Sequence, residues 1–468
     1  MPEKPNIVYI MADDMGYGDP GCYGAEKIPT PNMDRLASEG MRFTDAHSSS
    51  AVCTPSRYSV LTGRYCWRTH LKRGVLGGLS YPLIDPARLT IAGLLKQQGY
   101  ATAAVGKWHV GLGWQTREGV SHIVHDWEDD GEVDFNRRIV NGPVDVGFDY
   151  FFGIAGSLDM PPYCFIENDR TVGIPDRPKE HYFAQQRKGR QVPDWDDRQV
   201  DLQHARKACD WLRQTCSRDP DEPFFLYLTP SNPHRPCVPP EFLEGASDAG
   251  PRGDCVCVVD YVLGQVLDTL DELDLAEETM VVLTSDNGAR PADVDRDTHG
   301  HRSCGELRGF KAQIWEGGHR EPFLVRWPAR VKPGTTCDQT ICLMDMMATV
   351  ADLTGTDLPE NVAEDSFSFA PLLDGEPARP RRMLVHHSVD GTYALRRGTW
   401  KMILGAGPGG FHNDWITPPE DDGLPGQLYD MEKDWRETTN LWADRPDIVE
   451  EMKADLQAII DAGRTRPA

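Results

Sequence analysis

Positive charge is scarce in this sequence of 468 residues, in which 49 Lys and Arg stand against 73 Asp and Glu, for a formal net charge of −24. Proteins that bind nucleic acids or anionic membranes rely on Lys and Arg that meet phosphates, so this balance argues against both partners. Long apolar runs are also missing, since no stretch approaches the roughly eighteen residues that span a bilayer. With 39% hydrophobic and 26% charged residues, the composition is that of a large acidic globular protein, most typically an enzyme.

Paired cysteine motifs and a leader segment are missing as well. The 12 cysteines are scattered, form no CxxC pair, and do not build the dense framework of a small secreted domain. No basic and then apolar leader precedes the first apolar segment, which follows Pro5 directly. We therefore expect either a cytoplasmic protein or a chain that begins at a mature boundary, and the native compartment stays open.

Short apolar runs alternate with helix-like segments along most of the chain. The runs that we predict as buried strands are 7–11, 101–105, 224–228, 280–284 and 323–325. Apolar spacing and end signals predict helices at 32–39, 89–98 and 254–273. This alternation indicates an α/β fold with a large, mostly parallel sheet sandwiched by helices.

The pattern changes near residue 376. Runs at hairpin spacing predict an antiparallel sheet followed by one helix; they are 383–388, 393–397, 400–404 and 427–430, with the helix at 447–462. We expect two domains, a catalytic domain at 1–375 and a smaller C-terminal α+β domain at 376–468. Two long aperiodic segments, 112–150 and 156–200, are typical of loops at a functional rim.

Reactive side chains follow four of the predicted strands. They are Asp13 and Asp14, Lys107 and His109, His234, and Asp286 and Asn287. Parallel sheets bind ligands beyond the carboxyl ends of their strands. One such group alone is usually a solvated loop, but four together predict a single shared site.

The most informative segment is CTPSRYSVLTGR at 53–64. Pro55 can begin a helix and Gly63 can end it, which places Cys53 at a helix N-terminus, where N–H groups and the dipole favour an anion. A lone cysteine is more often a buried and inert residue, so this segment needs support from the rest of the chain.

That support comes from further motifs, through which the sequence resembles the type I sulfatases of the alkaline-phosphatase-like superfamily. Segment 53–64 matches their first signature, and GYATAAVGKWH at 99–109 matches the second. The other matches are NIVYIMADDMGYG at 6–18, SDNG at 285–288, RGFK and EGGHR within 308–320, and LYDM and ETTNL within 428–441. The resemblance spans most of the chain, in the family's order.

The resemblance implies that a separate maturase oxidises Cys53 to the aldehyde Cα-formylglycine, reading Pro55 and Arg57. Once hydrated, the aldehyde has one hydroxyl to attack sulfur and a second to expel sulfate, whereas a serine would stay trapped as its sulfate ester. The implied activity is hydrolysis of a sulfate ester to inorganic sulfate and an alcohol. Family habit favours a carbohydrate sulfate cleaved from a chain end, with aryl sulfates as surrogate substrates, and an exported protein.

A divalent cation belongs to the same implied site. Its ligands would be residue 53 together with Asp13, Asp14, Asp286 and Asn287. Hard oxygen donors favour Ca²⁺ or Mg²⁺ over zinc, and several flexible carboxylates favour Ca²⁺ of the two. Adjacent aspartates or an SDNG turn alone would more often cap a helix or form a simple turn.

The remaining implied roles concern cations and proton transfer. Arg57 would hold the hydrated aldehyde and sulfate, while Lys107 and Lys311 would neutralise sulfate oxygens. His109 would take the proton of the second hydroxyl, and His234, sharing with Lys311, would protonate the leaving alcohol. We expect the substrate pocket to draw on 112–130, 156–200 and 299–304. Weaker signals stay outside the core site: His122, His125, His181, Trp114, Trp195, His301, His386 and His387.

Two other functions stay open. The first is hydrolysis of phosphonate or phosphate esters on the same scaffold. Such an enzyme would differ from a sulfatase in the charge and geometry around the bound anion, and the motifs do not distinguish the two. A sulfated-glycan-binding protein with a dead site would lack at least one catalytic residue, yet every expected position is filled.

Overall fold

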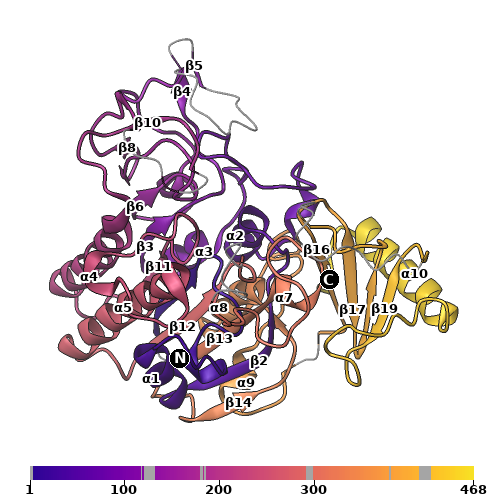
Figure 1. The fold of residues 1–468 in the computed structure, drawn as a ribbon. Coiled ribbons are helices and arrows are strands. Elements are labelled where there is room, and N and C mark those ends of the chain that lie inside the picture. Colours follow the sequence, from indigo (N-terminus) through magenta and orange to yellow (C-terminus); the bar gives the residue numbers. More distant parts are fainter. Residues whose placement is uncertain are drawn as a thin grey trace.

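One large mixed sheet forms the centre of the molecule, and a smaller sheet lies beside it (Figure 1). The computed structural model describes residues 4–116, 119–120, 132–179, 183, 186–290, 299–378, 381–410 and 423–467. In spatial order the large sheet contains β14 (Thr335–Cys337), β2 (Met41–His47), β13 (Arg320–Arg326), β12 (Thr279–Ser285), β1 (Asn6–Ala12), β11 (Phe224–Thr229), β3 (Ala101–Lys107), β6 (Tyr150–Ile154), β7 (Ile166–Glu167) and β8 (Arg170–Thr171), with β15 (Ile341–Cys342) paired to β2.

The middle of this sheet is parallel. Strands β12, β1, β11, β3 and β6 run side by side in one direction, and Ile10 of β1 is in register with Leu228 and Leu283. Strand β13 pairs antiparallel with β12 and with β2. The mostly parallel sheet predicted from the sequence is thereby confirmed, and the four strands followed by reactive side chains are immediate neighbours.

Helices cover both faces of the sheet (Figure 1). One face carries α1 (Pro31–Ser38), α4 (Val200–Arg218) and α5 (Gly250–Glu272), and the other carries α2 (Cys53–Thr62), α3 (Ile91–Gln97) and α8 (Met346–Leu353). Alternate residues of β1 serve the two faces, because successive side chains of a strand point to opposite sides. Ile7 and Tyr9 pack towards α2 and α3, whereas Val8 and Ile10 pack towards α1 and α5.

The C-terminal sheet is antiparallel, in the order β16 (Met383–His387), β17 (Tyr393–Arg397), β18 (Trp400–Ile403) and β19 (Gln427–Asp430). Helix α10 (Pro446–Ala462) packs its Met452 and Leu456 on one face of it, and this confirms the predicted sheet and helix. Tyr65 and Trp67 of the large unit share that core. The domain boundary between residues 375 and 376 stays a prediction.

Apart from six single-turn 3-10 helices, the other described strands and helices are short as well. They are β4 (Gln115–Thr116), β5 (Gly119–Val120), β9 (Arg177–Pro178), β10 (Arg190–Gln191), α7 (Glu316–His319) and α9 (Ala370–Leu373). Strands β2 and β6 and helices α4 and α8 have no counterpart among our sequence predictions. Within the described part of the chain, every helix is too short or too polar to cross a membrane.

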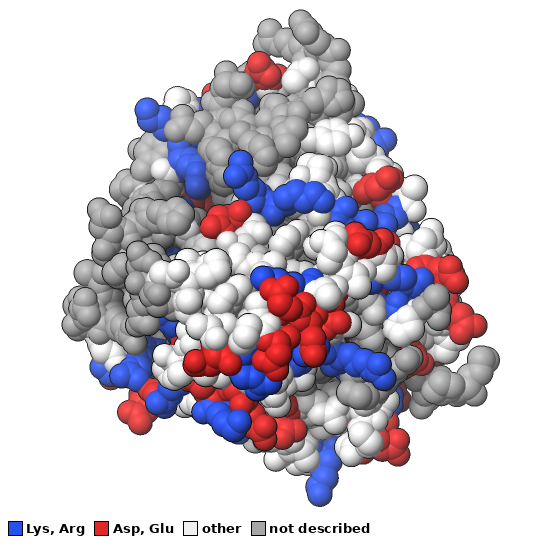
Figure 2. Space-filling model, turned by 90° about the vertical axis from the view of Figure 1, so that its right-hand side faces the viewer, with Lys and Arg blue, Asp and Glu red and all other residues white. Residues whose placement is uncertain are grey.

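Many charged side chains lie on the face of the molecule on the side of α10 (Figure 2). Acidic and basic side chains are interspersed there, with acidic ones gathered near the middle of the view. On this side Arg397 of β17 pairs with Glu451 and Asp455 of α10. Exposed pairs of this kind contribute little to stability, so we interpret this surface as a solvated one.

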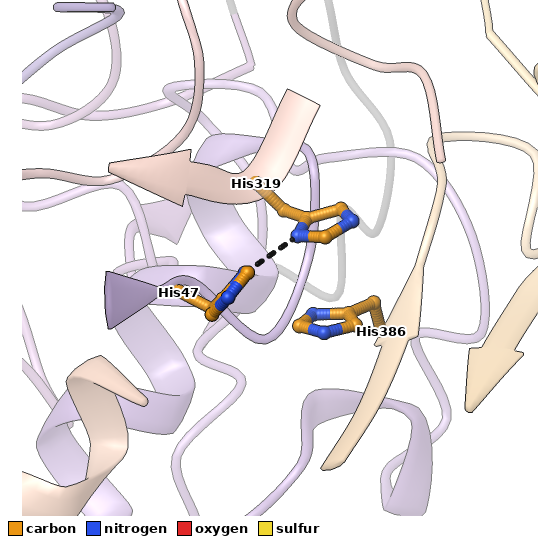
Figure 3. A group of neighbouring side chains, drawn as sticks. All are labelled: His47, His319 and His386. Carbon is orange, nitrogen blue, oxygen red and sulfur yellow. Dashed lines mark hydrogen bonds between the residues drawn. The ribbon is translucent and has the colours of Figure 1, made fainter. Parts of the chain in front are cut away.

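Three histidines meet where the small sheet joins the large one (Figure 3). The rings of His319 and His386 stack with 3.8 Å between centroids, and His47 Nδ1 lies 3.1 Å from His319 Nδ1. From the sequence we expect one of His386 and His387 to face inward. Both are 1% exposed, because the small sheet is covered on both faces and His386 points towards the large unit.

A buried lysine completes this junction. Lys401 Nζ of β18 lies 3.0 Å from Glu316 Oε1 and 2.7 Å from Glu437 Oε1, and it donates to His319 Nε2 at 3.0 Å. The side chains of Lys401, Glu316 and Glu437 are fully buried. We call the set Glu316, His319, Lys401 and Glu437, with His47 and His386, the junction cluster.

Candidate active site

The side chains predicted at the strand ends converge at the carboxyl edge of the parallel strands. Asp13 and Asp14 follow β1, Lys107 ends β3, and Asp286 follows β12, while Cys53 begins the neighbouring helix α2. All five are buried. Residues far apart in the sequence therefore meet in one place, which is the arrangement that parallel α/β sheets use for ligands.

Helix α2 presents Cys53 at its first position. Its N-terminal neighbour Val52 is extended, and Gly63 ends the helix in the left-handed conformation at φ 63°, as the Pro55 and Gly63 pattern predicts. Cys53 Sγ lies 3.4 Å from Lys311 Nζ and 3.6 Å from Asp13 Oδ1. Burial, and then the Asp286 carboxylate, raise the pKa of the Cys53 thiol far above its usual range, so the unmodified thiol stays protonated at neutral pH.

Three cations face three carboxylates around Cys53. The ion pairs are Arg57 NH2 with Asp286 Oδ2 at 2.7 Å, Lys107 Nζ with Asp13 Oδ2 at 2.6 Å, and Lys311 Nζ with Asp14 Oδ1 at 2.5 Å. Burial alone would raise the pKa of Asp14. The neighbouring cations, Lys311 above all, outweigh burial and keep this pKa below its usual range. At Asp13 burial dominates, and with help from Asp286 and Asp14 it raises the pKa to about 7.

A group of ligand-capable atoms lies beside this charge cluster. Asp13, Asp14, Cys53 and His234 each offer a donor atom within 4.8 Å of the others. Asn287 Nδ2 donates to Asp14 Oδ1 at 2.8 Å, which leaves its buried Oδ1 without a hydrogen-bond partner among the described residues. An oxygen-rich donor set with an unsatisfied buried oxygen suits a hard cation.

The junction histidines form a second group of nitrogens close enough for a metal ion, namely His47, His319 and His386. The rings of His319 and His386 are nearly parallel, at an angle of 14° (Figure 3). Their in-plane lone pairs therefore do not converge on one point. The existing hydrogen bonds of His47 to Asp45 and of His319 to Lys401 account for this group without an ion.

Two imidazoles line the pocket that contains Cys53. His109 donates from Nε2 to the Leu76 carbonyl at 2.7 Å, and its buried Nδ1 has no hydrogen-bond partner among the described residues. His234 donates from Nδ1 to the Arg235 carbonyl at 2.8 Å, and its Nε2 lies 3.7 Å from Asp14 Oδ2. Burial, followed by nearby lysines, lowers the pKa of both imidazoles well below 6.5, so both are neutral at pH 7.

The pocket has a volume of about 400 Å³. Besides Cys53, Lys311 and the two imidazoles, it is lined by Ser157, Asp159 and Arg187 from the aperiodic segment 156–200. Residues 300–302, which we also expect there, line a different cavity with Tyr17 and Trp435. Most of 112–130, including His122 and His125, and also His181, lie outside the described residues.

Some lining residues escaped sequence reasoning. Asp159 and Arg187 belong to no motif, and their only signal is their position in a long aperiodic segment. Arg235 follows His234 directly, and its neighbour could have drawn attention to it. Trp114 and Trp195, two weaker signals, donate instead to the Gly78 carbonyl and to Asp197.

Comparisons with known proteins identify the family of this chain. Residues 5–356 match the family model described as Sulfatase. The chain is 34% identical to an N-acetylgalactosamine-6-O-sulfatase of Bacteroides thetaiotaomicron, over 98% of this chain and 93% of that protein. It is 33% identical to human arylsulfatase A, over 98% of this chain and 89% of that protein.

A solved structure is similar to this chain in fold as well as in sequence. A Bacteroides thetaiotaomicron protein, reported with work on the metabolism of multiple glycosaminoglycans, superposes with a TM-score of 0.85 at 33% identity. The match covers 98% of this chain and 99% of that chain. The fold and these comparisons thus define a hydrolase of the alkaline-phosphatase-like fold. The chain belongs to the sulfatase family, and it is a sulfuric-ester hydrolase.

Proposed function

We propose that this enzyme removes sulfate from the end of a carbohydrate chain, accepts aryl sulfates as surrogates, and uses Cα-formylglycine made from Cys53. The observation that carries the proposal is the place of Cys53, whose Sγ lies 3.4 Å from Lys311 Nζ in a pocket with His109 and His234. The carbohydrate sulfatase at 34% identity supports the substrate class. The high pKa of the thiol supports conversion, because a protonated thiol is a poor nucleophile.

We infer that the site holds Ca²⁺, with Mg²⁺ as the second choice. Asp13, Asp14, Asp286 and Asn287, with residue 53, would be its ligands. The unsatisfied Oδ1 of Asn287 and the predominance of oxygen donors support a hard cation. When bound, such a cation polarises a sulfate oxygen and favours ionisation of the neighbouring hydroxyl.

The chain's own side chains supply the remaining electrostatics. Lys107 and Lys311 neutralise sulfate oxygens while charge shifts from sulfur to the leaving oxygen. Arg57, held by Asp286 and by the Lys107 carbonyl at 3.0 Å, orients residue 53. Residue 53, once converted and hydrated, would supply two hydroxyls: one would attack sulfur as the bond from sulfur to the leaving alcohol oxygen breaks, and deprotonation of the second would restore the aldehyde as the C–O bond to sulfate breaks.

Proton transfer falls to the two imidazoles. His109 accepts the proton of the second hydroxyl at Nδ1, since its Nε2–H is held by the Leu76 carbonyl. His234 donates from Nε2 to the leaving alcohol. Burial and then Lys311 lower its pKa, so His234 acquires this proton when the sulfate anion offsets the neighbouring cations. Lys311 shares the role, because Asp14 raises the pKa of Lys311 despite its burial and keeps it protonated.

The test begins with protein produced together with a formylglycine-generating maturase. Mass spectrometry of the Cys53 peptide should show the aldehyde, and sulfate release should be measured on a panel of defined mono- and oligosaccharide sulfates. A phosphodiester and a phosphonate ester of the same alcohol serve as competitors. We expect sulfated sugars to have the highest kcat/KM; faster turnover of the phosphoesters, or an unmodified Cys53 in an active enzyme, would overturn the proposal.

A further inference from the structure

The loop that follows β11, residues 230–236, brings His234 to the pocket that contains Cys53. Its sequence PSNPHRP contains three prolines, which have no N–H and cannot continue a regular hydrogen-bond pattern. His234 donates from Nδ1 to the carbonyl of Arg235 in the same loop at 2.8 Å. The backbone of the loop therefore directs the ring, and with it Nε2, the atom from which the leaving alcohol would be protonated.

Asp201, the second residue of α4, accepts hydrogen bonds from this loop. The backbone N–H of Ser231 donates to Asp201 Oδ1 at 2.8 Å, and that of Asn232 donates to Oδ2 at 2.9 Å. The side chain of Asn232 donates from Nδ2 to the same Oδ2 at 2.7 Å. Buried backbone N–H groups need an acceptor, and here a helix side chain supplies it to two consecutive residues of an irregular loop.

His204 holds Asp201 in turn. It lies three residues further along α4 and donates from Nδ1 to Asp201 Oδ1 at 2.8 Å, and its ring packs edge to face with Phe152 and Phe165. The side chains of His204 and Asp201 are 0% and 1% exposed. Burial alone would raise the pKa of Asp201, but the hydrogen bond from His204 and those from the loop outweigh burial and keep this pKa below its usual range. Asp201 is thus a carboxylate, and its hydrogen bonds are charge-assisted and strong.

A second contact joins the loop to the end of β1. The backbone N–H of Asp13 donates to the Asn232 carbonyl at 3.1 Å. This contact involves backbone atoms alone, so it does not depend on which side chains the two residues carry. The contact with α4, in contrast, depends on the carboxylate at position 201. Asp201 is therefore a side chain on which the place of His234 depends.

We propose that Asp201, supported by His204, is a positioning residue for His234 and thereby determines how fast esters of weakly acidic alcohols are cleaved. The proton passes from His234 Nε2 to the alcohol oxygen as the bond from that oxygen to sulfur breaks. A leaving sugar oxygen is strongly basic and needs this proton, whereas 4-nitrophenolate leaves without it. A displacement of the acid by about 1 Å can cost on the order of 10²-fold in rate. The inference rests on the proposed function in one respect, namely that His234 is the acid.

The experiment compares two sulfate esters in assays of the matured enzyme, namely 4-nitrophenyl sulfate and the sugar sulfate that is cleaved fastest. The parameter is kcat/KM, which covers the steps up to cleavage of the bond between sulfur and the leaving oxygen. Asp201→Asn keeps one acceptor oxygen but turns an N–H group towards the loop. We expect it to lower kcat/KM on the sugar sulfate by on the order of 10²-fold, and on 4-nitrophenyl sulfate only slightly. An equal loss on both esters would indicate a merely structural role and would overturn the proposal.

Further variants link this loss to His234. His234→Ala should show the same selective loss, and the variant that combines it with Asp201→Asn should be no slower than His234→Ala alone, because both changes remove one function. Additive losses in the combined variant would overturn the proposal. Asn232→Ala removes the 2.7 Å hydrogen bond and leaves α4 unchanged, so it tests the contact if Asp201→Asn folds poorly; we expect a selective loss of about tenfold. Asp210→Asn, the same change at a 44% exposed position of α4, is the control and should leave both values unchanged.

Hydrogen exchange separates this inference from the proposed function, because it needs no turnover. In the unmatured protein, peptides that contain the loop should exchange amide hydrogens about 10- to 100-fold faster in Asp201→Asn than in the wild type, and peptides of α5 should not change. If no ester is hydrolysed, or if His234→Ala loses activity equally on both esters, the proposed function fails, while faster exchange would still show that Asp201 positions the loop that carries His234. If His234→Ala is selective and Asp201→Asn is not, or if the exchange of the loop is unchanged, the assignment of Asp201 fails alone.

Discussion

Two buried lysines of this molecule have similar partners and different surroundings. Lys311 pairs with Asp14 beside Cys53, and Lys401 pairs with Glu316 and Glu437 in the junction cluster. Lys311 lines a pocket of about 400 Å³. Lys401 lies between two packed sheets and has no exposed side-chain surface.

The polar atoms around each lysine explain the difference in role. In the junction cluster both nitrogens of His319 have partners, His47 Nδ1 on one side and Lys401 on the other. Near Lys311, in contrast, His109 Nδ1 and Asn287 Oδ1 are buried without a partner among the described residues. Buried polar atoms in proteins are nearly always satisfied. His109 lines the pocket that contains Cys53, so its Nδ1 is open to a ligand there, whereas Glu437 Oε1, which also lacks a hydrogen bond, faces Lys401 Nζ at 2.7 Å. A buried lysine paired with carboxylates is therefore not by itself evidence of an active site.

The largest expected effect comes from Cys53. In matured protein, Cys53→Ala should reduce sulfate release by on the order of 10⁴-fold or more, since removal of a nucleophile abolishes the covalent route. The unfolding temperature should change little, because a small side chain is removed next to a pocket. Sulfate release and thermal unfolding are measured together. Cys209→Ala on α4 is the control and should stay active; equal loss in both variants would contradict the assignment.

Removal of the cation should have the next largest effect. Chelation should lower kcat by on the order of 10²-fold or more, and Ca²⁺ should restore activity better than Mg²⁺ because the donors are flexible carboxylates. The unfolding temperature should fall as well, since an ion that binds only the folded chain stabilises it. Elemental analysis must confirm that the ion is gone, and full activity of such a metal-free sample would disprove the metal site.

Lys401→Met tests the other half of the comparison. It leaves Glu437 buried without its cation, while Glu316 keeps Arg320 NH1 at 3.4 Å and Arg396 NH1 at 3.9 Å. We expect a cost of about 3–5 kcal/mol of unfolding free energy in urea titrations. The kcat of the folded fraction should stay at the wild-type value, because the junction cluster does not contact the pocket that contains Cys53. Lys311→Met should show the reverse pattern, with kcat reduced by on the order of 10²–10³-fold. A catalytic defect in Lys401→Met would break the distinction between the two clusters.

The same contrast separates what the sequence could predict from what it could not. Strands β1, β3, β11 and β12 are continuous apolar runs. Such runs are typical of strands that are buried on both faces, so these strands can be predicted from the sequence. Strand β2 gives no such signal, because its sequence MRFTDAH mixes charged and apolar residues and its place depends on its pairing with β13. Helix α4 is hard to recognise in the sequence, because charged residues of its solvent-facing side alternate with the apolar residues that it buries.

The candidate site divides along similar lines. Cys53, Lys107 and Asp286 lie in motifs whose spacing is local, so short segments suffice to find them. Asp159 and Arg187 meet through the folding of a loop of irregular backbone, and neither composition nor periodicity encodes that contact. The His319 and His386 stack likewise depends on how two sheets pack.

The smallest expected effect concerns catalysis at mildly acidic pH: as the pH falls, the unfolding free energy should decrease before kcat/KM changes. Burial first, and then neighbouring cations or imidazoles, lower the pKa of His109, His319 and His386 well below 6.5. The unfolded chain therefore binds more protons below pH 6.5, and the unfolding free energy should fall as the pH drops, by about 1.4 kcal/mol per pH unit for each such histidine.

Catalysis should respond later, because His109 acts as a base and stays deprotonated until the pH approaches its lowered pKa. Between pH 7 and 6.5, kcat/KM of the folded enzyme should therefore stay nearly constant, whereas an imidazole with a pKa of 6.5 would lower it by about a third. His386→Phe should reduce the pH slope of stability by about one proton and leave the pH profile of kcat/KM unchanged. A shifted rate profile in this variant would mean that the junction cluster and the Cys53 pocket titrate together, and the two clusters would then have to be treated as one.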